Sequence, residues 1–248
     1  MIFNLLTMNK IENKFGEIRK FCMENANEEN VKKYSRYFTE GYDAYGLNKE
    51  TYITQRDRWL AEWEKDFSLQ DYLELGNKLI ATGKYEEASF AISFMYCNAD
   101  KFTVDTFEKL GLWLENDIVN WAHTDILSGN GLTHFFINHL LEIEEFADWA
   151  KSESIWKRRS VPVTLVELLK TDIQIERIFA VIDPLMMDKE KKVQQGLGWL
   201  LRESWKKEPD VTEEFLLKWK DHCGRTIIQY ATEKMTKEYR LKFRKEKN

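Results

Sequence analysis

Two pairs of residues have the types and spacing that could support chemistry. Trp121 and Asp125 are four residues apart, and Trp199 and Arg202 are three apart. On a helix, residues at these spacings share a face, so each pair would present an aromatic plane beside a charged group. A tryptophan beside an arginine on an exposed face suits stacking or phosphate contact better than packing.

The apolar residues around the first pair define the face on which it lies. Val119, Ala122 and Ile126 form an apolar stripe, and Trp121 and Asp125 fall at its edge in a helical projection. A carboxylate at the rim of a buried stripe is unfavourable unless it has a partner or a task. Asp125 is therefore the first candidate for a functional carboxylate.

The second pair lies on a helix whose apolar stripe points elsewhere. Trp199 and Arg202 project away from this stripe, and we expect both side chains to face solvent. The stripe itself consists of Val193, Leu197, Leu200 and Leu201.

Around these pairs the chain resembles the AlkD-type DNA alkylation repair glycosylases, a family built from HEAT-like helical repeats. The resemblance covers most of residues 28–240. The stretches that carry it are SRYFTEGYDAYGL (35–47), NWAHTD (120–125), SIWKRRSV (154–161), GLGWLLRESWKKEPDV (196–211) and RTIIQYATEKM (225–235). It implies an all-α chain, an α-solenoid of HEAT-like antiparallel helix pairs that forms a curved, concave DNA-binding surface.

The resemblance also implies roles for individual residues. The family's catalytic Trp-x-x-x-Asp matches Trp121 and Asp125, and its second cleft tryptophan matches Trp199. Its DNA-binding positions match Tyr37, Arg159 with Arg158 as a neighbouring alternative, and Arg202.

The implied reaction is the excision of cationic N3- or N7-alkylated purines from duplex DNA, without flipping of the damaged base. Cleavage of the N-glycosidic bond passes through an oxocarbenium-like sugar. Asp125 would stabilise this cation and orient water, while Trp121 and Trp199 would flank the deoxyribose. The arginines would hold phosphates. The resemblance implies a monofunctional enzyme, and no metal or organic cofactor is indicated.

These residues also have structural interpretations. Taken alone, Trp121 fits a core position better, Asp125 could cap a turn before Ser128, and Tyr37 could be a packing residue. His123 is interpreted as incidental. The alternative function is a non-catalytic HEAT-like scaffold that binds structured DNA or protein. The remaining tryptophans expected in the core or between repeats include Trp59, Trp63, Trp113, Trp149 and Trp219.

Composition favours long helices joined by short turns, because the 248 residues include only 11 Gly and 3 Pro. We expect one domain over residues 1–248, with residues 1–9 irregular and residues 240–248 forming a basic tail. Three widely spaced cysteines without a CxxC motif indicate reduced thiols and no zinc site. No signal peptide or membrane span is expected, so we predict a cytoplasmic monomer that binds double-stranded DNA with alkylated bases.

Charge is distributed unevenly along the chain. The net charge is −5, but residues 1–150 carry a balance of −11 and residues 151–248 a balance of +6. A basic face can bind phosphates on an acidic protein, because screening confines each charge to about 8 Å at physiological salt. The basic runs include KRR (157–159), KEKK (189–192) and RLKFRKEK (240–247); for the last two, a solvated helix surface is an equal alternative.

Apolar periodicity and capping signals predict helices along the whole chain and no strands. Ser68 with Asp71 and Asp210 with Glu213 have the spacing of capping boxes. Pro162 lies inside a helical pattern, so that helix either kinks or begins later. The expected helices span residues 10–25, 28–40, 49–65, 69–82, 84–97, 103–114, 117–128, 132–139, 141–151, 154–169, 172–182, 189–206, 211–221, 223–234 and 236–245.

Overall fold

The computed structural model describes residues 2–246, with side chains from residue 9 onward. Over this range the chain is all-helical with no strand, which confirms the predicted fold class. No helix of this part is long and apolar enough to cross a membrane. The helices group into two compact units, one reaching to Phe102 together with 117–123, and one of 103–116 with 124–246. The single-domain organisation stays a prediction.

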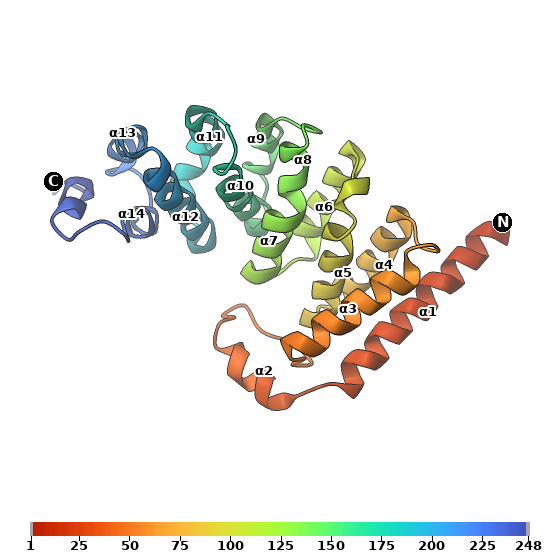
Figure 1. Ribbon diagram of the computed structural model, residues 1–248. Helices are drawn as coiled ribbons and strands as arrows, with labels where there is room; N and C mark the ends of the chain where they lie inside the picture. Colours follow the sequence, from red (N-terminus) through yellow and green to blue (C-terminus); the bar gives the residue numbers. More distant parts are fainter. Residues whose placement is uncertain (1, 247–248) are drawn as a thin grey trace. The chain divides into compact units, whose positions relative to one another are not determined.

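The first unit is built mainly from α1 and the pair α4 and α5. α1 begins at Ile2, where an irregular segment was expected over residues 1–9; Met1 lies outside the described residues. Figure 1 shows α1 as the long N-terminal helix. The helices of this unit are α1 (Ile2–Glu24), α2 (Glu28–Ser35), α3 (Lys49–Trp63), α4 (Leu69–Ala81), α5 (Tyr85–Tyr96) and η1 (Ala99–Lys101), and it includes the first residues of α7 (Trp121–Leu127).

An aromatic cluster fills the core of the first unit. Trp59 stacks on Trp63 at 5.6 Å between ring centroids, and Phe90 meets Trp59 edge-on at 5.2 Å. The Trp59 indole donates to Glu17 Oε1 at 2.6 Å, so its polar end is satisfied although the ring is buried. Offset and edge-to-face contacts of this kind add to the hydrophobic term that holds α3 against α5.

The second unit consists of two adjoining rows of helices. α10, α12 and α14 pack one after another, while α11 and α13 pack together beside them (Figure 1). This succession is that of a solenoid, in which each helix pair contacts mainly its neighbours. The helices of this unit are α6 (Val104–Asn116), the remainder of α7, η2 (Ser128–Leu132), α8 (Thr133–Ile137), η3 (Ile143–Glu145), α9 (Phe146–Trp149), α10 (Ile155–Leu168), α11 (Ile175–Ile182), η4 (Asp183–Met187), α12 (Lys191–Lys207), α13 (Pro209–Trp219), α14 (Arg225–Ala231) and η5 (Tyr239–Phe243).

Most of the local helix signals predicted from the sequence are confirmed. Ser68 and Asp71 form the predicted capping box at the start of α4. Pro162 lies inside α10, which nevertheless begins at Ile155, so the alternative of a later start is wrong. The second predicted capping box is also wrong: Pro209 begins α13 with its fixed φ, which places Asp210 in the first turn rather than at the cap.

Four of the five tryptophans expected in the core are buried, and the fifth is half-buried. Trp219 lies at the end of α13, where its indole donates to Asp183 Oδ1 at 3.1 Å. The buried ones are Trp59, Trp63, Trp113 and Trp149.

Two glycines let α12 approach its neighbours closely. A Cβ on Gly196 would lie 3.2 Å from Pro162 Cγ, and a Cβ on Gly198 would lie 2.4 Å from Tyr230 Cβ and 2.9 Å from the Ile227 carbonyl oxygen. Because Gly198 faces backbone of α14, no side-chain rotation could make room there.

We expect Gly198→Ala to lower the free energy of unfolding by about 1–3 kcal/mol, because the added methyl group forces α12 and α14 apart. Gly16→Ala is the matched control: Gly16 lies in α1 with no atom within 4 Å of the added Cβ. Better helix propensity should make that variant up to about 1 kcal/mol more stable. Urea denaturation of both variants checks this, and equal effects would contradict the packing argument.

Candidate active site

The helix that carries Asp125 has an irregular continuation. α7 passes directly into the π-helical segment η2 and then into α8. The turn that Asp125 could have capped is therefore absent, and the Ser128 hydroxyl instead donates to the Thr124 carbonyl at 2.7 Å. Short π-helical segments inside helices are frequent at functional sites because they re-aim the side chains around them.

Asp125 forms a bidentate ion pair with Arg159 of α10. Arg159 Nε donates to Asp125 Oδ1 and Arg159 Nη2 to Oδ2, both at 2.8 Å. The third guanidinium nitrogen, Nη1, donates to the backbone carbonyl of Lys192 in α12. Planar bidentate pairing fixes the orientation of a carboxylate as well as its position.

Burial and charge act on Asp125 in opposite directions. Burial raises the pKa of the Asp125 carboxyl above its ordinary value, while the hydrogen bonds and charge of Arg159 offset part of this rise. The Asp125 side chain is 18% exposed, whereas that of Arg159 is only 7% exposed. The carboxylate is thus open to an approaching ligand on one side, and its partner is not.

A surface hollow of about 300 Å³ lies beside this carboxylate. Trp199 of α12 forms its opposite wall and is half-buried. An aromatic wall and a fixed carboxylate on one hollow suit a cationic group. The lining residues are Asp125, Ile126, Gly129, Asn130, Val163, Glu167 and Trp199.

Trp121, one turn before Asp125 on α7, belongs to the first unit. Its indole Nε1 donates to the Tyr37 carbonyl at 3.1 Å, and its ring stacks on Phe38 at 5.7 Å between centroids. The Tyr37 side chain is 51% exposed, and its hydroxyl accepts from Arg36 at 2.8 Å. Trp121 is half-buried, so it is neither the core residue of the alternative interpretation nor fully exposed.

The loop after Tyr37 is held by a buried glutamate that the sequence analysis missed. The carboxylate of Glu86 accepts the backbone N–H groups of Tyr45, Gly46 and Leu47 at 2.8, 2.7 and 3.1 Å. Gly46 has φ +82°, and a Cβ there would lie 2.2 Å from the Asn27 carbonyl oxygen. Glu86 lies in the first turn of α5, where acidic residues are common, so its sequence position carries no distinctive signal of this role.

His123 is buried and structural, in keeping with its interpretation as incidental. Burial lowers the pKa of His123 to about 4. Its Nδ1 accepts from the Asn120 amide at 2.8 Å, so Nε2 carries the proton and donates to the Tyr85 carbonyl at 3.1 Å. The imidazole is therefore neutral at physiological pH and stacks on the Tyr85 ring.

The two other predicted DNA-binding arginines are engaged in ion pairs. Arg158 binds Asp188 at 2.6 Å and donates to two backbone carbonyls. Arg202 was expected to face solvent, but its side chain is 19% exposed and binds Glu203 and Glu233. This expectation is wrong because α14 packs against α12 and leads into Glu233. The DNA-binding roles of both arginines stay predictions.

Comparisons with known proteins identify the family and support the fold. Residues 18–235 match the family described as DNA alkylation repair enzymes. The chain belongs to this family. A solved structure described as a predicted DNA alkylation repair enzyme from Enterococcus faecalis aligns with a TM-score of 0.75 and 17% identity, covering 86% of this chain and 98% of that one. Among curated proteins, none matches the chain.

Family membership supports a role in the repair of alkylated DNA, as the resemblance in the sequence had implied. Of the predicted site residues, the fold brings Asp125 and Trp199 of this family member to one hollow, and Arg159 binds Asp125 without lining the hollow itself. Arg159 was predicted to hold a phosphate; its guanidinium instead turns inward, because burial next to Asp125 favours the ion pair.

The neutral state of His123 predicts how stability responds to acid. Its pKa in the folded chain is lowered to about 4, so its contribution is present above the ordinary value near 6.5 and is lost as pH falls towards 4. We expect a loss of about 3 kcal/mol over this interval. Urea denaturation between these pH values should show a flatter pH dependence for His123→Gln than for the exposed control His222→Gln. Equal slopes would contradict this assignment.

Proposed function

We propose that the protein is a monofunctional DNA glycosylase that excises cationic N3- and N7-alkylated purines from duplex DNA. The observation that carries the proposal is the Asp125 carboxylate, fixed by the Arg159 fork at 2.8 Å and facing a hollow whose other wall is Trp199. Negative charge and an aromatic face on one open hollow are what a cationic sugar requires.

The chemistry follows from the charge of the damaged base. Alkylation at N3 or N7 makes the purine a cationic leaving group, so the bond between its nitrogen and C1′ can break without a general acid. The bonding electron pair stays with the purine, which leaves neutral, and positive charge develops on the deoxyribose. Asp125 stabilises this charge and orients water, whose oxygen bonds to C1′ and whose proton passes to solvent.

The aromatic residues contribute through their faces. Trp199 is half-buried in the wall of the hollow, and its ring can lie against the deoxyribose as the cation forms. Trp121 lies on the same helix as Asp125, one turn earlier, and we assign it the same task. A hollow of about 300 Å³ is at the lower limit for enclosing a ligand, which favours recognition from the sugar and backbone side over insertion of a flipped base.

Arg159 acts as a positioning residue in this proposal. It touches the carboxylate rather than the sugar, and its buried guanidinium keeps Asp125 ionised by opposing the effect of burial on the pKa of that carboxyl. Cations other than Arg159 then bind the phosphates. Tyr37, Arg158 and Arg202 retain their assignment as DNA-binding residues.

We expect Asp125→Asn to lower the release of 7-methylguanine and 3-methyladenine from methylated duplex DNA by about 100-fold or more. Single-turnover assays measure this release, and Asp148→Asn, an exposed carboxylate on α9, is the matched control that should retain it. No release by the wild type while duplex binding persists would favour the non-catalytic scaffold. Release by a folded Asp125→Asn variant would rule out the assigned role of the carboxylate.

We expect Arg159→Gln to shift the acidic limb of the pH–rate profile to higher pH. Asp125 must be ionised to act, burial already raises its pKa, and loss of Arg159 removes the groups that lower it. Single-turnover rates across pH check this shift. Arg177→Gln breaks a comparable ion pair with Glu142 and Glu144 on the surface and should leave the limb in place. An unmoved limb for Arg159→Gln would reduce Arg159 to a packing role.

A further inference from the structure

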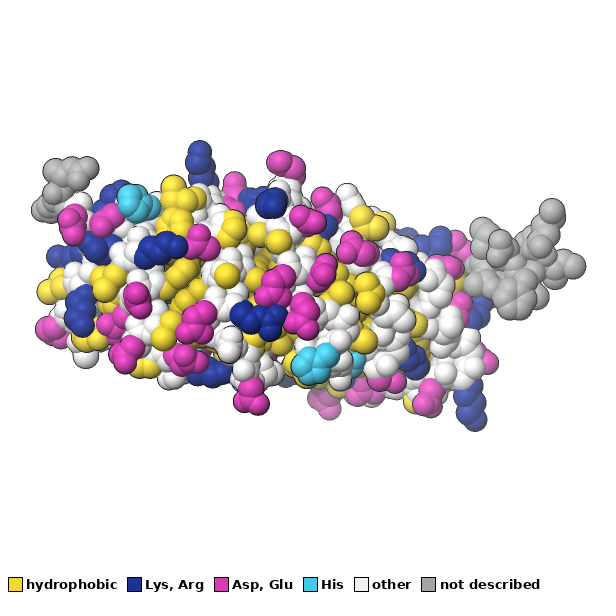
Figure 2. Space-filling model, turned by 90° about the horizontal axis from the view of Figure 1, so that it is seen from above, with side chains coloured by type: hydrophobic (Ala, Val, Ile, Leu, Met, Phe, Trp, Pro, Cys, Tyr) yellow, Lys and Arg dark blue, Asp and Glu magenta, His cyan; other side chains and the backbone are white. Residues whose placement is uncertain are grey.

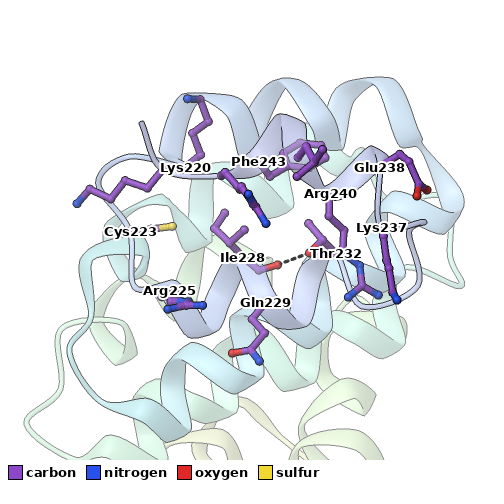
Figure 3. A pocket seen from close by; sticks show the side chains of 13 residues that line it. Lys220, Cys223, Arg225, Ile228, Gln229, Thr232, Lys237, Glu238, Arg240 and Phe243 are labelled. Carbon is purple, nitrogen blue, oxygen red and sulfur yellow. Dashed lines mark hydrogen bonds between the residues drawn. The ribbon is translucent and has the colours of Figure 1, made fainter. Parts of the chain in front are cut away.

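A second, larger hollow lies at the C-terminal end of the second unit. Its volume is about 920 Å³, and Figure 3 shows the side chains around it, which come from the end of α13, from α14 and from the segment around η5. Arg225 and Gln229 of α14 and Thr232, the residue that caps its C-terminal end, recur at helical spacing and border the hollow. It is separate in composition from the Asp125 hollow, with which it shares no residue.

The lining of this hollow is strongly basic. Six of its residues are Lys or Arg and one is acidic, Glu238, in a chain whose net charge is −5. The cations are Lys220, Arg225, Lys237, Arg240, Arg244 and Lys245. Such a concentration of one charge sign in a concave surface raises the local concentration of anions.

The pairing of these cations differs from that of the other arginines. Each arginine from Arg19 to Arg202 except Arg36 forms an ion pair with a carboxylate. In the hollow, the side chains of Arg225 and Arg244 have no hydrogen-bond or ion-pair partner among the described residues, and neither do the side chains of Lys237 and Lys245. Arg240 donates only to backbone carbonyls.

The face of the molecule drawn in Figure 2 contrasts with this grouping. Figure 2 shows Lys and Arg side chains interspersed with Asp and Glu over the face in view, as expected where cations are neutralised locally. In the C-terminal hollow, two arginines and two lysines lie together, and none of them has a carboxylate partner within the described part of the chain. Unpaired, exposed guanidinium groups that converge on one hollow are suited to bidentate contact with phosphate oxygens.

Apolar side chains also line the hollow. Phe243 is buried and anchors η5, and Ile228 lies on α14 (Figure 3). Leu241 lines the hollow as an exposed side chain. The Thr232 hydroxyl is already used, since it donates to the Ile228 carbonyl at 2.8 Å. Cations and apolar side chains lining one hollow suit a ligand that combines phosphates with sugar, as a nucleic-acid strand does, better than a free inorganic anion.

We infer that this hollow is a second DNA contact, which binds backbone phosphates of the duplex outside the excision site. The inference rests on the proposed DNA substrate but not on the excision chemistry. Arg225 and Arg244 carry it, because both are exposed and their side chains bind no other residue between positions 2 and 246. A contact of this kind adds affinity without reading sequence and without touching the reacting atoms.

The test compares two double variants that each remove two positive charges. Arg225→Gln with Arg244→Gln alters the hollow, and Lys65→Gln with Lys151→Gln removes two exposed cations outside it. Fluorescence anisotropy with an undamaged duplex, at several salt concentrations, measures affinity and its salt dependence. Calorimetry with inorganic tripolyphosphate tests the other source of phosphate, and thermal melting verifies that both variants are folded.

For the hollow variant we expect duplex affinity to fall about tenfold or more, and the slope of log K against log salt to shrink by about 0.9 per lost phosphate contact. Excision at saturating DNA should stay at the wild-type rate. Equal duplex binding by the two double variants would overturn the inference, as would a loss confined to tripolyphosphate, which indicates a small phosphorylated ligand. Failure of the wild type to bind duplex at all would instead overturn the proposed function.

Discussion

One guanidinium links three helices, α7, α10 and α12, at the candidate active site. From α10, Arg159 donates to Asp125 on α7 through Nε and Nη2, and to the Lys192 carbonyl of α12 through Nη1. Removing either partner of such a buried pair leaves an uncompensated charge, so the pair fixes both the site and the stacking of the helices that form it. The contact therefore fixes the carboxylate at the hollow and ties α7 and α12 to α10.

The same contact explains why the carboxylate is available for chemistry. Burial alone would favour a protonated Asp125, and Arg159 opposes that effect from the inner side while the outer side stays open. Close approach of α10 and α12, which Gly196 permits next to Pro162, brings Trp199 to the opposite wall. A perturbed carboxyl in a hollow, with a specific charge partner, is a typical property of functional sites.

Buried carboxylates have different roles in the two units. In the first unit, Glu86 accepts three backbone N–H groups and fixes the loop that follows Tyr37 and Phe38, the residues that contact Trp121. In the second unit, Asp125 is paired with a side chain and faces a ligand hollow. The carboxylate of Glu86 is hydrogen-bonded within the chain, whereas the carboxylate of Asp125 stays partly open to the hollow. The C-terminal hollow likewise presents its positive charge to solvent.

The sequence by itself determined the all-helical architecture and most helix positions, because apolar periodicity, Ser68 capping α4 and scarce Gly and Pro act locally. It also singled out Asp125 and Trp199 as candidates. Only the tertiary structure decided that Arg159 turns inward to Asp125, that Arg202 is paired with Glu233, and that Glu86 is an anchor. Helical spacing gives the face of a side chain, but its partner depends on which helices pack against that face, and those partners lie tens of residues away in the chain.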